Sequence, residues 1–230
     1  MATMSEKQLE RILQEQWLED GERLKALLGG EGLSGHLGAT LDGRSFLPYR
    51  PQSSVAELNV DHSQLPVPTE AIRNMRFHGD EWLHDPAVRG WVYGRSADTR
   101  AFSWADHMAA AGPEAWYVYT DRRMAVVVDS AVRTQRDEHA DSVAEQQESE
   151  QSGGFGRLLG KARSAASAIS GAAESVKGRA KASVVTLWEC PVSEIVNSRL
   201  VPKGRTAQGY DVMVQEFHDG SVLEIRADSA

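Results

Sequence analysis

The chain has 230 residues and a formal net charge of −8, with 41% hydrophobic and 25% charged residues. These proportions are typical of soluble globular proteins and exclude wholesale disorder and a membrane-embedded fold. The acidic balance argues against a nucleic-acid-binding protein, which needs a basic face. The first residues lack the apolar core of a signal peptide, no apolar run is long enough to span a bilayer, and Cys190 is the single cysteine. We therefore expect a cytoplasmic protein without a disulfide or a cysteine-based zinc site.

An N-terminal amphipathic helix is predicted over residues 1–30. Ser5 and Gln8 have the pattern of a helix-capping box, and Gly29-Gly30 would end the helix. Its apolar face would either bind a partner, an oligomer through this helix included, or dock on the chain's own domain. This face consists of residues at steps of three and four: Leu9, Ile12, Leu13, Trp17, Leu24, Leu27 and Leu28.

Residues 31–78 are rich in glycine and proline, which predicts an extended arm or linker. Within it, Thr69 would cap a short helix over residues 70–75.

A β-domain is predicted over residues 79–132 and 184–230. Residues 116–119 and 124–128 are two β-prone runs around a polar centre, which predicts a hairpin, and three consecutive valines predict that its second strand is buried on both faces. Residues 210–217 alternate, and Asp219-Gly220 predicts a tight turn into the last strand. Residues 101–111 fit a helix or a loop. We count seven expected strands, around Trp91, Trp116, Val126, Trp188, Val196, Val212 and Leu223.

The segment between the third and fourth expected strands has two parts of opposite charge. Residues 133–154 are acidic and polar, which predicts a flexible linker. Residues 155–183 fit a basic amphipathic helix whose glycines would make it weakly helical in water. Its candidate contact residues are the cations Arg157, Lys161, Arg163, Lys177, Arg179 and Lys181 and the apolar residues Phe155, Leu158, Leu159, Ile169 and Val176.

The order of several short motifs resembles the bacterial pleckstrin-homology-like domain. They are Thr120-Asp121-Arg122-Arg123 before an aliphatic strand, a Pro-x-Ser-x-Ile segment at 191–195, a basic turn at 203–205 and the Asp219-Gly220 hairpin. The resemblance covers roughly residues 115–130 and 184–227. It implies a mainly β (α+β) fold, a partly open seven-strand barrel. Because such domains end in a helix that closes the barrel and this sequence stops after the last strand, the helix of 5–28 or that of 155–183 would have to cover the open end. We expect Asp121 to hold its turn by bonding neighbouring amides.

The expected function is binding without catalysis. A basic amphipathic helix can lie in a membrane interface, so the chain is interpreted as a bacterial cytoplasmic adaptor that docks on an anionic membrane surface, with lipid binding, or on a protein partner. The 155–183 helix could equally pack on the chain's own domain. The alternative function is a structural subunit or assembly factor whose N-terminal helix and arm wrap neighbouring subunits.

Catalytic, metal and cofactor sites are not indicated. The seven histidines lack metal-ligand spacing, and no nucleophile or phosphate-binding motif occurs. Only a pocket that gathers His78, His84, Asp106 and His107 would favour an enzyme. Cys190 is expected to be a buried, inert thiol, whereas Trp82 and Trp104 could mark a binding surface.

Overall fold

The computed structural model describes residues 4–29, 35–133, 184–204 and 209–227. Its helices are α1 (Glu6–Ile12), which continues as the π-helical turn η1 (Leu13–Trp17), α2 (Glu70–Arg73) and α3 (Arg100–Ala111). Short 3₁₀ turns are η3 (His62–Gln64), η4 (Glu81–His84), η5 (Gly112–Glu114), η6 (Ser130–Val132) and η8 (Val192–Glu194). The strands are β1 (Leu24–Gly29), β2 (His36–Leu41), β3 (Arg44–Phe46), β4 (Val88–Gly94), β5 (Trp116–Thr120), β6 (Arg123–Asp129), β7 (Val184–Pro191), β8 (Ile195–Lys203), β9 (Tyr210–Phe217) and β10 (Val222–Arg226).

The strands form two sheets, and the fold is mainly β with a few helices. One sheet has the order β1-β5-β6-β7 and the other β3-β2-β4-β10-β9-β8. All described pairings are antiparallel except that of β2 with β4, which is parallel. Neither sheet closes into a barrel in the part of the chain that is described. The expected single seven-strand barrel is therefore replaced by two sheets, although each of the seven expected strands is present.

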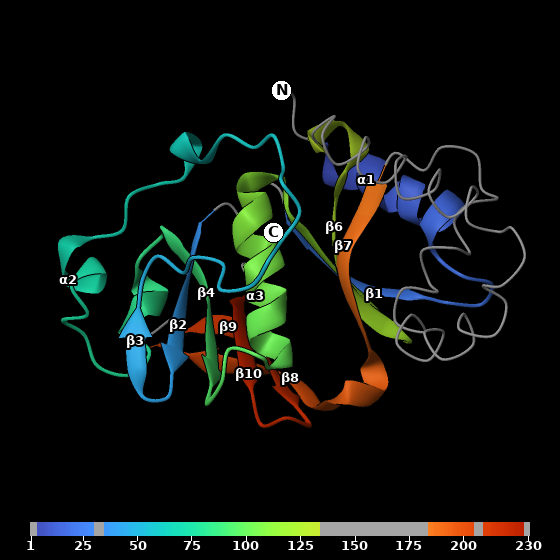
Figure 1. Cartoon of the computed structure of the whole chain (residues 1–230). Helices are drawn as coiled ribbons and strands as arrows, with labels where there is room; N and C mark the ends of the chain where they lie inside the picture. Colours follow the sequence, from blue (N-terminus) through green and yellow to red (C-terminus); the bar gives the residue numbers. More distant parts are fainter. Residues whose placement is uncertain (1–3, 30–34, 134–183, 205–208, 228–230) are drawn as a thin grey trace, which may run out of the picture.

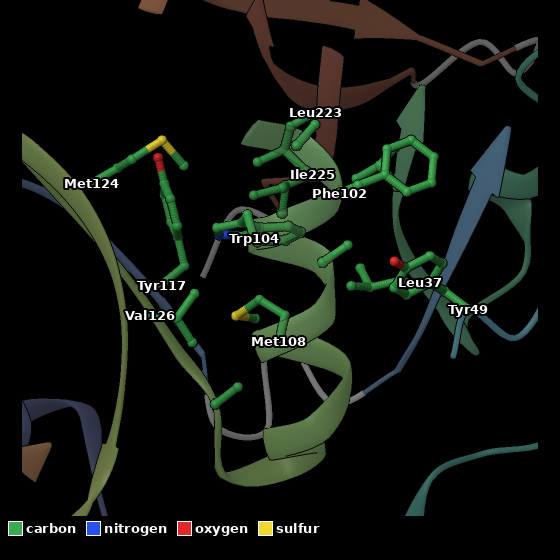
Figure 2. Close-up of a cluster of buried hydrophobic side chains, with 14 of the residues drawn as sticks. Leu37, Tyr49, Phe102, Trp104, Met108, Tyr117, Met124, Val126, Leu223 and Ile225 are labelled. Carbon is green, nitrogen blue, oxygen red and sulfur yellow. The ribbon is translucent and has the colours of Figure 1, made fainter. Parts of the chain in front are cut away.

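Helix α3 lies between the two sheets and organises their shared core (Figure 1). Figure 2 shows Trp104 and Met108 of α3 directed toward Tyr117 and Val126 of the four-stranded sheet. On the six-stranded sheet, Leu223 and Ile225 of β10 complete the same cluster. The helix that fills the space between the sheets is thus the 101–111 segment, not the 5–28 helix.

Strand β6 is buried on both faces, as its three consecutive valines predict. Its even-numbered residues Met124 and Val126 face the α3 core, whereas Ala125 and Val127 face a second cluster on the outer side of the sheet. Helix α1 and the start of η1 cover that outer side, and their Leu9, Ile12 and Leu13 are buried there among these residues. The apolar face of α1 therefore docks on the chain's own domain.

The predicted helix over residues 1–30 is only half right. Ser5 caps α1 and its side chain accepts a bond from Gln8 N, as predicted, but the helical part ends at Trp17. Gly21 has a φ of 76°, and the turn around it leads into β1. The leucines at 24, 27 and 28 belong to this strand, because the helical part already ends where Leu18 takes an extended backbone conformation, with φ −66° and ψ 140°.

The 31–78 arm is also partly wrong as an extended linker, because it contains β2 and β3. The parallel pairing of β2 with β4 needs close approach at Gly38, where a Cβ would lie 2.1 Å from the Trp91 ring. The rest of the arm packs at two places: Leu47 and Ile72 join a third buried cluster with Trp91 of the six-stranded sheet, whereas Tyr49 is buried in the core around α3. Gly38 is needed because the Trp91 ring packs against it, but in the sequence such a glycine looks like part of a loop.

Candidate functional site

The described strands on either side of residues 134–183 pair directly with each other, β6 with β7. Asp129 at the end of β6 pairs with Val184 at the start of β7, and Arg133 forms an isolated bridge with Leu58. The residues between them, 134–183, are therefore an insertion between two strands that pair directly. The predicted contact residues of the 155–183 segment all lie outside the described residues, as does nearly all of the acidic 133–154 stretch.

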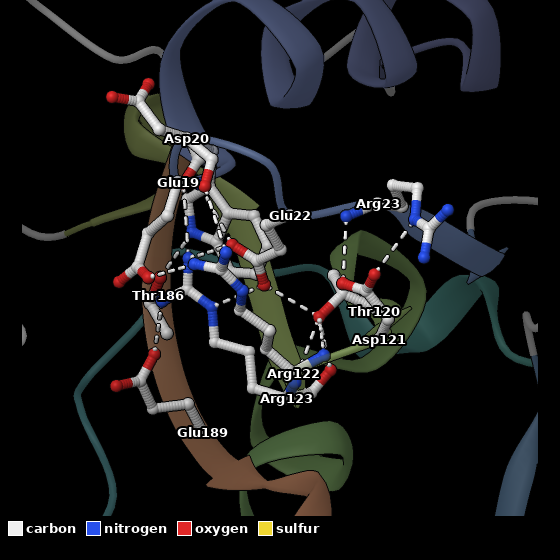
Figure 3. Close-up of polar contacts among 11 residues, drawn as sticks. Glu19, Asp20, Glu22, Arg23, Thr120, Asp121, Arg122, Arg123, Thr186 and Glu189 are labelled. Carbon is white, nitrogen blue, oxygen red and sulfur yellow. Dashed lines mark hydrogen bonds and ion pairs between the residues drawn. The ribbon is translucent and has the colours of Figure 1, made fainter.

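The Thr120-Asp121-Arg122-Arg123 turn joins β5 to β6 and binds the N-terminal segment (Figure 3). Arg123 is the centre of this contact. Its guanidinium donates to both carboxylate oxygens of Glu22, at 3.0 and 3.1 Å, and to Glu189 Oε2 at 3.0 Å. It also lies 4.0 Å from the centroid of the Trp17 ring and donates to the Trp17 carbonyl. The guanidinium therefore ties the segment after α1 to both β6 and β7.

Glu22 is held in its ionised form by these contacts. Burial alone would raise its pKa, but hydrogen bonds from Arg123, from Glu19 N and from Thr120, together with the charge of Arg123, lower the pKa below its usual value. The Glu22 side chain is fully buried, so the pair is shielded from water.

The predicted role of Asp121 in the turn is wrong, and Thr120 takes it. The Thr120 hydroxyl oxygen accepts from Arg122 N at 3.1 Å and from Arg123 N at 2.9 Å, and it donates to Glu22 Oε1 at 2.6 Å. Asp121 instead accepts from Arg23 N and Nε at the start of the N-terminal strand, and these bonds lower its pKa. The carboxylate thus pairs across the sheet, not within its own turn.

Arg122 also makes intramolecular contacts. It donates to Glu19 Oε2 at 3.1 Å and to the Asp20 carbonyl at 3.0 Å. Both arginines of the turn therefore serve the docking of the N-terminal segment, and this favours an architectural role of the motif over a role in lipid recognition.

The structure does not bring together the residues that would favour an enzyme. The buried Asp106 accepts from Tyr49 Oη and from the Gln52 and Ser53 amides, so it anchors the arm on α3. His107 bonds the Ser103 carbonyl within α3, and His84 packs edge-on against the Tyr210 ring. Across residues 4–29, 35–133, 184–204 and 209–227, no group of three or more metal-ligating side chains occurs.

Cys190, Trp82 and Trp104 are all interior residues. Burial raises the pKa of the Cys190 thiol to about 11, which agrees with the predicted inert thiol. Trp82 and Trp104 are fully buried. The suggestion that these two tryptophans mark a binding surface is therefore wrong: each supplies core volume, Trp82 beside Trp91 and Trp104 against Tyr117.

A cavity of about 420 Å³ lies between the start of β2 and the end of α3. It is lined by His36, Tyr49, Arg50, His62 and Met108, among others. Burial lowers the pKa of His36 despite its bond to the Pro66 carbonyl, and Tyr49 is already bonded to Asp106. The lining therefore combines two imidazoles, those of His36 and His62, with the Arg50 guanidinium and several apolar residues, and this combination selects no single ligand class.

Within the described ranges, no helix is long and apolar enough to cross a bilayer. Comparison with protein-family models gave no family that matches the chain, and searches of curated proteins and of solved structures gave no match. The function has to be argued from the geometry and the charge distribution.

Proposed function

We propose that the chain is a non-enzymatic adaptor with a pleckstrin-homology-like core, which docks on an anionic membrane surface through the basic amphipathic segment 155–183. It would act in the cytoplasm, peripheral to the inner face of the membrane. One observation carries the proposal. The segment belongs to an insertion between β6 and β7, two strands that pair directly with each other, with Asp129 opposite Val184. The succession of the β5–β6 hairpin, β7, the η8 turn and the β9–β10 hairpin supports the choice of core.

The charge distribution supports a membrane contact confined to the insertion. Residues 155–183 carry six cations and one acid, and residues 134–154 carry six acids and one cation. The net charges of these two parts cancel, so the rest of the chain carries the whole net charge of −8. An anionic surface would repel this core and attract the 155–183 segment, with about 1 kcal/mol for each Lys or Arg near the surface. Burial of Phe155, Leu158, Leu159, Ile169 and Val176 would follow.

The alternative function, a subunit whose N-terminal helix and arm wrap neighbours, is less well supported. The apolar residues of α1 pack on the four-stranded sheet and those of the arm pack on the six-stranded sheet of the same chain. These segments therefore use their apolar faces within the molecule.

Vesicle co-sedimentation tests the proposal. The full chain should sediment with phosphatidylglycerol-containing vesicles and not with pure phosphatidylcholine vesicles. The double substitution Lys161→Glu and Arg163→Glu should abolish sedimentation. A matched control, Arg44→Glu with Arg73→Glu, makes the same charge change at exposed positions of the described core and should still bind. Failure of the unmodified chain to sediment with anionic vesicles would reject the membrane surface and favour a protein partner.

A further inference from the structure

A cavity of about 160 Å³ lies on the face of the six-stranded sheet opposite α3. Trp91 and Tyr93 of β4 line it from the sheet, and because they are two positions apart they project from the same face. Met75 and Phe77, from the loop after α2, line it from the other side. The remaining lining residues are Thr40, Ser45 and Gly79. The lining is therefore rich in aromatic rings and contains no charged side chain.

The aromatic rings of this cavity are held at fixed angles. The Trp91 ring occupies the space where a side chain at Gly38 would lie, and its indole N–H donates to Thr40 Oγ1 at 2.9 Å. The Phe77 ring meets the Trp91 ring at an interplanar angle of 75°, with 5.5 Å between the ring centroids. Tyr93 lies opposite Thr40 in the β2–β4 pairing, so its ring stands beside the same corner. Such a corner of rings presents π faces, which attract cations.

Negative charge lies beside these rings. Glu224 of β10 projects from the same face of the sheet as the aromatic residues of β4, because it pairs in register with one of them. Burial and the charges of Glu224 and Asp80 raise the pKa of Tyr93, so both carboxylates are close to the Tyr93 hydroxyl. Glu224 pairs with Lys203, whereas Asp80 Oδ2 accepts from the Gly204 amide at 2.9 Å. A neutral amide does not cancel the charge of Asp80, which therefore adds to the negative faces of the rings.

The loop that completes the cavity has a strained backbone. Met75 has a φ of 56°, in the left-handed region that residues with a side chain rarely adopt. Gly79, at the other end of the loop, has a φ of 62°. These two turns set the path that brings Met75 and Phe77 to the cavity. Backbone strain of this kind is concentrated at ligand-binding positions in proteins.

We propose that this cavity binds a small soluble quaternary ammonium ion of the choline type. Its methyl groups would contact the rings of Phe77, Trp91 and Tyr93, and its positive charge would face the π clouds and the Asp80 carboxylate. A quaternary ammonium needs no hydrogen-bond acceptor, and the Thr40 hydroxyl is already bonded to Trp91 and to the Ser45 hydroxyl. Compounds that carry an anion next to the ammonium group, such as glycine betaine or a phosphatidylcholine headgroup, would be repelled by Asp80.

Titration of the full chain with choline chloride tests the charge preference of the cavity. The Trp91 indole N–H signal in NMR spectra should shift saturably with choline and with tetramethylammonium, and sodium chloride at the same concentration should not shift it. Neohexyl alcohol, the uncharged isostere of choline, and glycine betaine should each bind about tenfold more weakly than choline or worse. Equal affinity for either of these two compounds, or no saturable shift with choline, would overturn the proposal.

Substitutions at Phe77 test the role of the rings. Phe77→Leu keeps an apolar side chain but removes the ring, and it should weaken choline binding about tenfold, whereas Phe77→Tyr keeps the ring and should bind like the unmodified chain. Phe46→Leu is the matched control, because Phe46 stacks on Tyr49 and packs on the core around α3, away from the cavity. A Phe77→Leu variant with an unchanged urea midpoint and unchanged choline affinity would contradict the proposal. Because no vesicles are present, both experiments are independent of the proposed membrane function.

Discussion

Arg123 and Glu22 form a two-bond ion pair across a sequence separation of 101 residues, with the Glu22 side chain fully buried. The pair joins the turn after η1 to the start of β6. Because α1 itself carries few residues, the position of the N-terminal segment depends on this pair and on the apolar contacts of α1 with the outer side of the sheet.

Glu22→Gln should destabilise the fold measurably. The substitution keeps the shape of the side chain but removes its charge, and hydrogen bonds to charged groups contribute about 2 kcal/mol. Urea unfolding at pH 7 should therefore show a loss of about 2 kcal/mol in the free energy of unfolding. Arg23→Ala serves as the control, because Arg23 pairs with Asp121 at the surface with its side chain 77% exposed, and it should leave the urea midpoint nearly unchanged.

The effect of Glu22→Gln should depend on pH. The folded-state pKa of Glu22 is lowered, so its stabilising contribution is complete above the unfolded-state pKa of about 4.3 and is lost as pH falls through the folded-state value. The difference in unfolding free energy between the unmodified chain and Glu22→Gln should therefore shrink as the pH is lowered below about 4.3. A difference that stays constant down to the acid transition would mean that the charge of Glu22 is not what stabilises the contact.

Thr120→Val should be more damaging than Asp121→Asn. The valine leaves the Arg122 and Arg123 amides without the hydroxyl that they share, and buried groups left unsatisfied cost about 1–3 kcal/mol. Asp121→Asn keeps an oxygen that can accept from Arg23 N at the surface. Urea midpoints of the two variants, measured side by side, give the comparison; an equal or larger loss for Asp121→Asn would show that the carboxylate holds the turn.

Circular dichroism should report the membrane contact directly. The 155–183 sequence contains several glycines, each of which disfavours helix by about 1 kcal/mol relative to alanine. We therefore expect helicity of the full chain to rise on addition of anionic vesicles, and the Lys161→Glu, Arg163→Glu variant to show no rise. An unchanged spectrum of the unmodified chain with anionic vesicles would argue against interfacial helix formation.

The two hairpins and the burial of β6 could be predicted because each depends on residues close in sequence. Asp219-Gly220 forms the turn between β9 and β10, with Gly220 at a φ of 79°. In β6, three consecutive valines in the sequence are enough to indicate a strand that is buried on both faces. Strand β2 could not be predicted, because it pairs with β4 across about 50 residues and its Gly38 serves the Trp91 ring. The leucines of β1 fit a helical face equally well, and only pairing with β5 makes them a strand.

For the basic segment and for the Thr120–Arg123 turn, the sequence predicts which residue types are present but not which residues they contact. The basic pattern of 155–183 can be counted from the sequence, but the pairing of Asp129 with Val184 depends on the fold. In the Thr120–Arg123 turn, the motif itself could be recognised. Its partner Glu22 gives no signal, because it stands among neighbouring charged residues such as Glu19, Asp20 and Arg23 and looks like an ordinary surface residue.

The most direct test of the membrane proposal replaces residues 134–183 with a short glycine-serine linker between Arg133 and Val184, and measures co-sedimentation with anionic vesicles. Because Asp129 and Val184 are already paired, the shortened chain should keep the urea midpoint of the unmodified chain. It should also lose all sedimentation with phosphatidylglycerol-containing vesicles. A shortened chain that unfolds at the same urea concentration and still binds these vesicles would contradict the proposal.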